Sequence, residues 1–247
     1  MILLKRENPF SKSPATRHAW FLYLGGAIGV MTTAFNNLAF SRISVSSILA
    51  LGLFGQSISG LIVDQYGLLN MPKHPFQKQK ICGLFLILCG IVSMTNNFDI
   101  LAVLVSFIAG VNIVVSRTLN AKLAEYTSIR TGTFFNYLIG LLVALPVCFL
   151  LGKSEAAFTG IVVSSKIYIY LGGIIGVCVV LLSNITVTKI PAFYLSLFLF
   201  IGQVFSGILI DALISKTFSP RNMIGGIFVA AGLCVNLLLD KKEPSAS

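Results

Sequence analysis

The sequence predicts an all-α polytopic membrane protein of about eight transmembrane helices, arranged as two inverted-topology repeats. Three observations lead to this fold class. Of the 247 residues, 56% are hydrophobic and only 11% are charged, whereas a soluble domain carries roughly 25% charged residues. Long apolar runs alternate with short basic or polar breaks, and one stretch of sequence recurs further along the chain. The composition therefore excludes most soluble enzymes, nucleic-acid binders and secreted modules.

Each apolar run is expected to be helical, because lipid offers no partner to an unpaired backbone group and a span takes about 20 apolar residues. The run at 81–96 is short for a span. The eight predicted spans are residues 19–40, 44–63, 81–96, 99–118, 132–151, 167–187, 191–213 and 223–239.

The distribution of Lys and Arg sets the expected orientation. When the breaks are assigned to alternate sides of the membrane, 13 of the 18 basic residues fall on one side and 5 on the other. Because basic residues collect in cytoplasmic loops, both termini should be cytoplasmic in a multi-pass protein of the inner (plasma) membrane. The net charge of +10 has the same explanation and requires no nucleic-acid partner.

An internal repeat is the most informative feature. Residues 23–26 (YLGG) recur as residues 170–173, an offset of 147 residues that also takes several polar residues onto identical ones without a gap. The matched polar pairs are Asn37 with Asn184, Gln56 with Gln203, and Asp64 with Asp211. Five predicted spans separate equivalent points. An odd number inverts the second copy relative to the first, as in many secondary transporters.

The repeat divides the chain into residues 1–96, with three helices, and residues 97–247, with five. The offset places Leu3 and Leu4 on Leu150 and Leu151, which end the second helix of the second repeat. The first repeat is therefore expected to lack its two N-terminal helices. A homodimer or a small membrane partner would then supply them; alternatively, the start of the chain has been assigned too late.

The order of the motifs resembles that of a known family. The motifs are YLGG-x-IGV from Tyr23, GQ-x-x-SG from Gly55 followed by Asp64, the run Asn120-Ala121-Lys122-Leu123, and Phe134-Phe135-Asn136. Together they resemble the YdcZ-like inner-membrane exporter family of the drug/metabolite transporter (DMT) superfamily. The resemblance implies a ten-helix permease or exporter of small molecules and names no substrate.

Uncharged polar side chains within the predicted spans are candidates for a substrate path. A buried amide needs partners, and polar groups within a membrane usually face the bundle interior or a cavity. Such residues either hold helices together through hydrogen bonds or line a path. The path candidates are Gln56, Gln203, Asn37, Asn184, Asn112, Asn120 and Asn136.

Two carboxylates are candidate gates. Asp64 and Asp211 lie near the ends of their spans, on opposite faces of the membrane under the inverted topology. A carboxylate near a helix C-terminus opposes the helix dipole. Each is either an interfacial anion, solvated by headgroups or paired with a nearby Lys or Arg, or a proton- or cation-responsive gate at one mouth of the path.

Small residues four positions apart allow helices in lipid to approach closely. This spacing occurs in both copies of the repeat and marks candidates for helix packing. They are Gly25, Gly29, Gly55, Gly172, Gly176 and Gly202. The alternative interpretation is a sliding surface that switches between inward-open and outward-open states.

The sequence contains no nucleophile–base or phosphate-loop motif, and its two His and five Cys lack the spacing of a metal site. We therefore expect no enzyme, no cofactor and no metal. The predicted function is DMT-type transport or export of a small molecule across the lipid bilayer, by alternating access between the inverted repeats. The alternative is a non-transporting membrane subunit that assembles with or regulates a partner transporter.

The orientation is open to a direct test with single cysteines introduced at Lys78 and Ser154. The charge distribution places residues 64–80 in the cytoplasm and residues 152–166 outside. An impermeant thiol reagent applied to intact cells should label the Ser154→Cys protein and spare the Lys78→Cys protein. The reverse labelling pattern would overturn the orientation.

Overall fold

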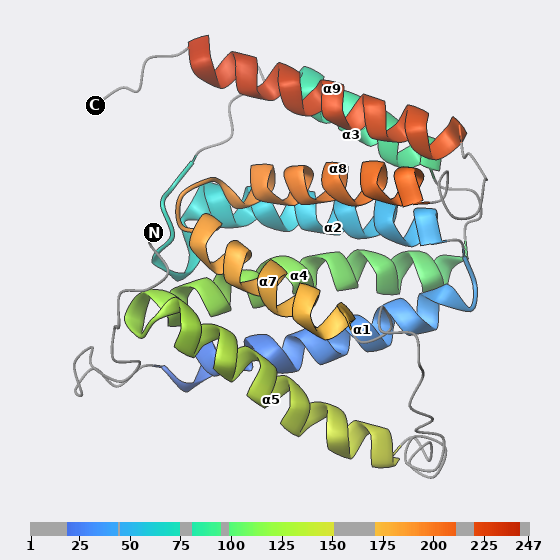
Figure 1. Cartoon of the computed structure of the whole chain (residues 1–247). Coiled ribbons are helices and arrows are strands. Elements are labelled where there is room, and N and C mark those ends of the chain that lie inside the picture. Colours follow the sequence, from blue (N-terminus) through green and yellow to red (C-terminus); the bar gives the residue numbers. More distant parts are fainter. Residues whose placement is uncertain are drawn as a thin grey trace. The chain divides into compact units, whose positions relative to one another are not determined.

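The computed structural model describes residues 19–43, 45–74, 81–94, 99–150, 171–210 and 220–242, and these residues are helical apart from short turns (Figure 1). The prediction of an all-helical chain is confirmed for these residues. Their α-helices are α1 (Gly25–Phe40), α2 (Val45–Tyr66), α3 (Ile81–Met94), α4 (Ile100–Tyr126), α5 (Ile129–Leu150), α7 (Leu171–Thr186), α8 (Ala192–Ile210) and α9 (Pro220–Lys242). Two short 3₁₀ helices, η1 (Trp20–Leu24) and η2 (Leu68–Asn70), precede α1 and follow α2.

Three helical segments in the described part of the chain are long and apolar enough to cross a membrane. They are Ser47–Tyr66, Ile100–Tyr126 and Ile129–Phe149. Four shorter apolar helical segments lie at Ile81–Ser93, Leu171–Thr186, Ala192–Ser206 and Met223–Leu239. Each α-helix overlaps one of the eight predicted spans.

The largest difference from the predicted boundaries is at the end of α4. The prediction ended this span at residue 118, because polar and charged residues follow, but the helix continues to Tyr126. No Gly or Pro interrupts residues 118–126, and residues 118–124 are buried. The break comes at Thr127 and Ser128, where the Ser128 hydroxyl accepts a hydrogen bond of 3.1 Å from the backbone N–H of Thr131. Ser128 thereby caps the first turn of α5.

The chain forms two compact units. The first unit comprises residues 1–31 and 115–189, and the second comprises residues 32–114 and 190–247, so the boundary between them cuts α1 and α4. Each unit combines segments from both predicted repeats. The division of the sequence at residue 96 concerns the repeat and stays a prediction, as does the inversion of the repeat.

The second unit contains two layers of paired helices. Helix α2 lies alongside α8, and α3 lies alongside α9 above them in Figure 1. Fully buried side chains fill the space between the layers, among them Leu53, Ile87, Leu197, Phe200 and Val229. Because lipid is as apolar as these side chains, close van der Waals packing rather than the hydrophobic effect holds such helices together in a membrane.

Helices α3 and α9 touch through glycines at two crossing points. A Cβ atom on Gly83 would lie 2.6 Å from the carbonyl oxygen of Gly232, and one on Gly90 would lie 2.6 Å from that of Gly225. The lower number on α3 meets the higher number on α9, so the two helices run antiparallel. Backbone therefore meets backbone at both points, and no side chain larger than a hydrogen fits between them.

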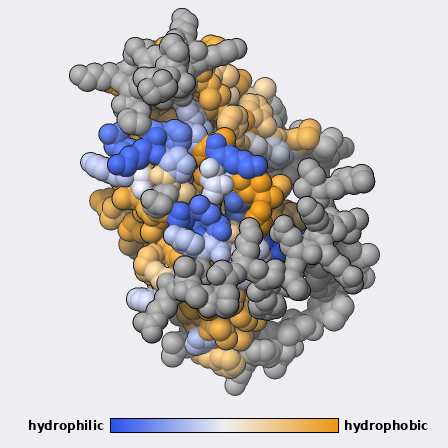
Figure 2. Space-filling view, turned by 90° about the vertical axis from the view of Figure 1, so that its left-hand side faces the viewer, coloured by the Kyte–Doolittle hydropathy of each residue, from blue (hydrophilic) through white to orange (hydrophobic). Residues whose placement is uncertain are grey.

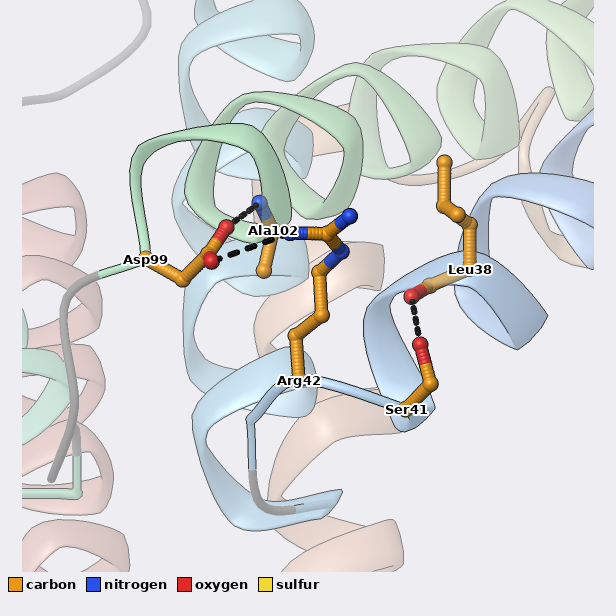
Figure 3. A network of polar contacts seen from close by, with 5 residues as sticks. All are labelled: Leu38, Ser41, Arg42, Asp99 and Ala102. Atoms are coloured by element: carbon orange, nitrogen blue, oxygen red, sulfur yellow. Dashed lines mark hydrogen bonds and ion pairs between the residues drawn. The ribbon is translucent and has the colours of Figure 1, made fainter.

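An exposed ion pair joins the segment after α1 to the start of α4 (Figure 3). Asp99 accepts a hydrogen bond of 2.9 Å from the backbone N–H of Ala102, which caps α4, and its other oxygen lies 3.2 Å from Nη1 of Arg42. The hydrogen bond from Ala102 and the charge of Arg42 hold the pKa of the Asp99 carboxyl below its ordinary value. The segment after α1 and the segment before α4 thus meet through this ion pair.

Much of the surface is apolar. Figure 2 shows one face of the protein, on which hydrophilic surface is bordered by hydrophobic surface. Large exposed apolar side chains include Phe85 and Val92 on α3, Ile174 and Leu182 on α7, and Leu238 on α9. Exposed apolar side chains of this size are expected on helices that lie in a membrane.

The contact between α3 and α9 predicts an effect of Gly232→Ala on stability. The added Cβ would meet backbone oxygen and the side chain of Ile87, and overpacking of this kind costs about 1–3 kcal/mol. The matched control is Gly202→Ala on α8, where nothing lies within 4 Å of the added Cβ and Ala favours the helix by about 1 kcal/mol. Thermal unfolding in detergent should show a lower midpoint for Gly232→Ala alone. Equal midpoints for the two variants would contradict the close contact.

Candidate functional site

The candidate site is a set of hydrogen-bonded polar side chains on α4 and α5 in the first unit. Nδ2 of Asn120 donates a hydrogen bond of 2.7 Å to Oδ1 of Asn136 and lies 3.4 Å from the hydroxyl of Ser116. The Ser116 hydroxyl in turn donates to the carbonyl oxygen of Gly25, at 2.7 Å. Asn120 is buried, at 4% exposed. The resulting chain of hydrogen bonds links α1, α4 and α5.

A second hydrogen-bonded contact joins α7 to α5. Nδ2 of Asn184, which is 3% exposed, donates a hydrogen bond of 3.2 Å to the hydroxyl of Thr133. The Thr133 hydroxyl donates to the carbonyl oxygen of Ile129, at 2.8 Å. Because Thr133 and Asn136 are three residues apart on α5, they lie on neighbouring turns of one helical face. Three path candidates therefore meet at α5: Asn136 lies on this helix, and Asn120 and Asn184 donate hydrogen bonds to its side chains. We call Ser116, Asn120, Thr133, Asn136 and Asn184 the polar layer.

Two consecutive glycines make the polar layer possible. A Cβ on Gly25 would collide with the side-chain amide of Asn120, and one on Gly26 would collide with the backbone carbonyl of Asn136. Gly140 lies against Gly26 on the facing helix. The start of α1 can approach the amides this closely only because these positions carry no side chain.

A pocket of about 400 Å³ lies beside the polar layer, at the turn between α4 and α5 and the end of α7. It is lined by Ala121, Ala124, Glu125, Thr127, Ser128, Ile129, Asn184, Ile185, Thr188 and Lys189. Its volume is within the range of small-molecule sites, roughly 300–1,000 Å³. The pocket lies wholly within the first unit.

The sequence interpretation missed the role of Lys122. This residue lies beyond residue 118, where the predicted span ends, but it is on α4 and is 5% exposed. Its Nζ lies 2.7 Å from Oε2 of Glu125 and 5.3 Å from the centre of the Tyr126 ring, within the range of a cation–π contact. The spacing of three residues between Lys122 and Glu125 is typical of a helical ion pair, and it could have indicated that the helix continues.

Asp64, a gate candidate, joins two helices in the second unit. The residue is 5% exposed, and its two carboxylate oxygens accept hydrogen bonds of 2.8 Å and 2.9 Å from the backbone N–H groups of Ala192 and Phe193. These N–H groups open the first turn of α8 and have no partner within the helix. Although Asp64 lies near the C-terminus of α2, its charge faces the favourable N-terminal end of α8. Asp211, the second gate candidate, lies outside the described residues.

The other path candidates are on segments of the second unit. Gln56 is half-buried on α2, and Gln203 is exposed on α8. Asn37 is exposed on α1. Asn112 is half-buried on α4, with its Nδ2 buried and without a hydrogen-bond partner among the residues the structure describes.

The six glycine candidates have different surroundings. Gly25 lies against Asn120, and Gly55 on α2 lies against the backbone of Phe107 on α4. A Cβ on Gly176 would lie 3.0 Å from the hydroxyl of Tyr137. The three with nothing within 4 Å of an added Cβ are Gly29, Gly172 and Gly202.

Among the described residues, no three of His, Cys, Asp and Glu come together. The features that remain are buried uncharged polar side chains, a pocket and apolar spans.

A family model described as "Putative inner membrane exporter, YdcZ" matches residues 1–93 and 101–235. The chain belongs to the YdcZ family. The comparison with curated proteins found no match.

Membership of the YdcZ family places the chain in a membrane and in a class of exporters rather than enzymes. It confirms the resemblance stated from the sequence motifs. The family description names neither a substrate nor a mechanism, so the roles of individual residues follow from their surroundings alone.

The pairing of Asn120 with Asn136 predicts a measurable coupling. Replacing either residue by Leu leaves a polar group without its partner, at a cost of about 1–3 kcal/mol. The double variant should lose less stability than the sum of the single variants, by about 0.5–2 kcal/mol. Unfolding in detergent measures all four proteins, with Asn37→Leu at an exposed position as the control. Strict additivity of the two single effects would argue against the hydrogen bond.

Proposed function

We propose that this YdcZ-family protein exports a small molecule by alternating access between two inverted repeats, along a path that includes the polar layer. The family supplies the direction and the class of activity. The path and the mechanism are the additional elements of the proposal, and they rest on the packing within each unit.

The polar layer is the observation that carries the proposal. It places the buried amide of Asn120 on α4 and the buried hydroxyl of Thr133 on α5, and both helices belong to segments long and apolar enough to cross a membrane. Polar groups at such positions are costly in lipid and are characteristic of substrate pathways. The pocket of about 400 Å³ beside Asn184 gives a solute access to the layer.

Helix packing in the second unit supports the inverted repeat. The offset of 147 residues takes α2 onto α8, and these two helices are paired, as are the following helices α3 and α9. Equivalent helices of an inverted repeat cross the membrane in opposite directions. The glycine contacts make α3 and α9 antiparallel, and Asp64 near the end of α2 caps the beginning of α8.

Asp64 has a defined part in this mechanism. Its two hydrogen bonds fasten the end of α2 to the start of α8, so this contact between the repeats must be kept or released as the repeats move. Gln56, Gln203, Asn37 and Asn112 remain candidates for further stretches of the path.

Export by this chain alone is testable without knowing the substrate. Liposomes containing the purified protein are loaded with a small-metabolite extract of the cells that express it, and the solutes retained over time are measured by mass spectrometry. At least one solute should leave faster than from empty liposomes. The loss should slow by about tenfold or more in Asn120→Leu, because the path loses a polar group.

The control for this assay is Ser206→Leu, which places the same side chain at an exposed position on α8. Size-exclusion chromatography confirms that each variant is folded. If no solute leaves faster than from empty liposomes, the protein does not transport by itself. A membrane subunit that assembles with a partner transporter would then be the better interpretation.

A further inference from the structure

The chemistry of the pocket beside Asn184 defines the class of molecule that fits it. The pocket contains both charged and uncharged polar groups, so the question is which of them are already satisfied within the protein. Two observations decide this: the hydrogen bonds of Asn184 and the ion pair of Glu125.

The orientation of the Asn184 amide follows from its neighbour. The hydroxyl of Thr133 donates its only proton to the carbonyl oxygen of Ile129, at 2.8 Å. It can therefore only accept from Asn184, which requires Nδ2 of the amide to face it, at 3.2 Å. Oδ1 of Asn184 is left buried and without a hydrogen-bond partner among the described residues. A buried acceptor of this kind needs a donor.

One positively charged group in the pocket is not paired with a carboxylate. The Glu125 carboxylate is paired with the buried Lys122, at 2.7 Å. Lys189 lines the pocket and is exposed. Lys189 has no ion pair with a carboxylate among the residues that the structure describes. The pocket thus has one satisfied carboxylate and one available ammonium.

We infer that this pocket binds a small organic carboxylate that also carries a hydroxyl or amino group, such as a hydroxy acid or an amino acid. The anionic group pairs with the ammonium of Lys189, and the hydroxyl or amino group donates to Oδ1 of Asn184 when the ligand displaces the atoms that now cover it. The inference deepens the proposed function and rests on it in taking the pocket as part of the export path. The volume of about 400 Å³ leaves room for ligands larger than a three-carbon acid.

Lactate and propionate are matched probes, because they differ by one hydroxyl group. Binding is measured on the purified full chain in detergent, from the rise in unfolding temperature with increasing concentration of each acid. Wild-type protein should bind lactate about 5-fold more tightly than propionate, as expected for one additional hydrogen bond. Choline, a cation of similar size, should not bind.

Two variants separate the two contacts. Asn184→Leu should abolish the preference for lactate over propionate while leaving weak binding of both acids. Lys189→Gln should weaken both acids about equally and keep the preference. Lys73→Gln removes an exposed lysine outside the pocket and should change neither quantity.

Three results would overturn the inference: equal binding of lactate and propionate by the wild type, an unchanged preference in Asn184→Leu, or tighter binding of choline than of lactate. Absence of binding by all three probes would also overturn it. The liposome assay fails or succeeds separately, since binding in detergent needs no transport. Solute export without a preference for lactate refutes the ligand class alone, and lactate binding without export refutes the proposed function alone.

Discussion

The hydrocarbon core of a bilayer cannot hydrogen-bond to the protein, and the structure reflects this constraint. It requires helical backbone in the spans, and it leaves helix ends and polar side chains to find partners within the chain. Ser128 caps α5, Asp99 caps α4, and Asp64 caps α8 from a different helix. The polar layer follows the same constraint, because Asn120 on α4 and Asn184 on α7 each donate a hydrogen bond to a side chain of α5. The site is therefore built from the interactions that also hold the helices together.

Helices in a membrane must also pack closely without a hydrophobic driving force, and glycine allows this close packing. The contacts between α3 and α9 and between α1 and α5 are made through backbone atoms at glycine. At the polar layer this packing has a chemical result, because the bare backbone of Gly25 and Gly26 brings α1 up to the amides of α4 and α5. The closely packed glycines and the polar side chains therefore lie next to each other in the first unit.

The sequence was sufficient to predict the helices, since apolar runs and lipid together leave few alternatives. It was less informative about where a helix ends: the polar composition after residue 118 suggested an end there, whereas α4 continues and places Lys122 near Glu125 and Tyr126. Small-residue spacing indicated glycines at helix contacts but could not say which have a neighbour, because that depends on the facing helix. Gly25 has one and Gly29 has none within 4 Å. Likewise, Asn120 and Asn136 were candidates individually, and only the fold shows that they are bonded to each other.

The cap that Asp64 provides for α8 has a consequence for how the protein is made. The carboxylate and the N–H groups it binds are 128 and 129 residues apart, so the ribosome completes α2 long before it synthesises α8. During that interval Asp64 lacks these two hydrogen bonds. Because a charged side chain is costly within the hydrocarbon core, this favours a position of the end of α2 at the aqueous interface of the bilayer. The arrival of α8 supplies the missing N–H groups and allows the carboxylate to become buried. Biogenesis of this part of the protein is therefore completed by a late helix acting on an early one, and a chain cut short before α8 lacks the two N–H groups that hold the Asp64 carboxylate.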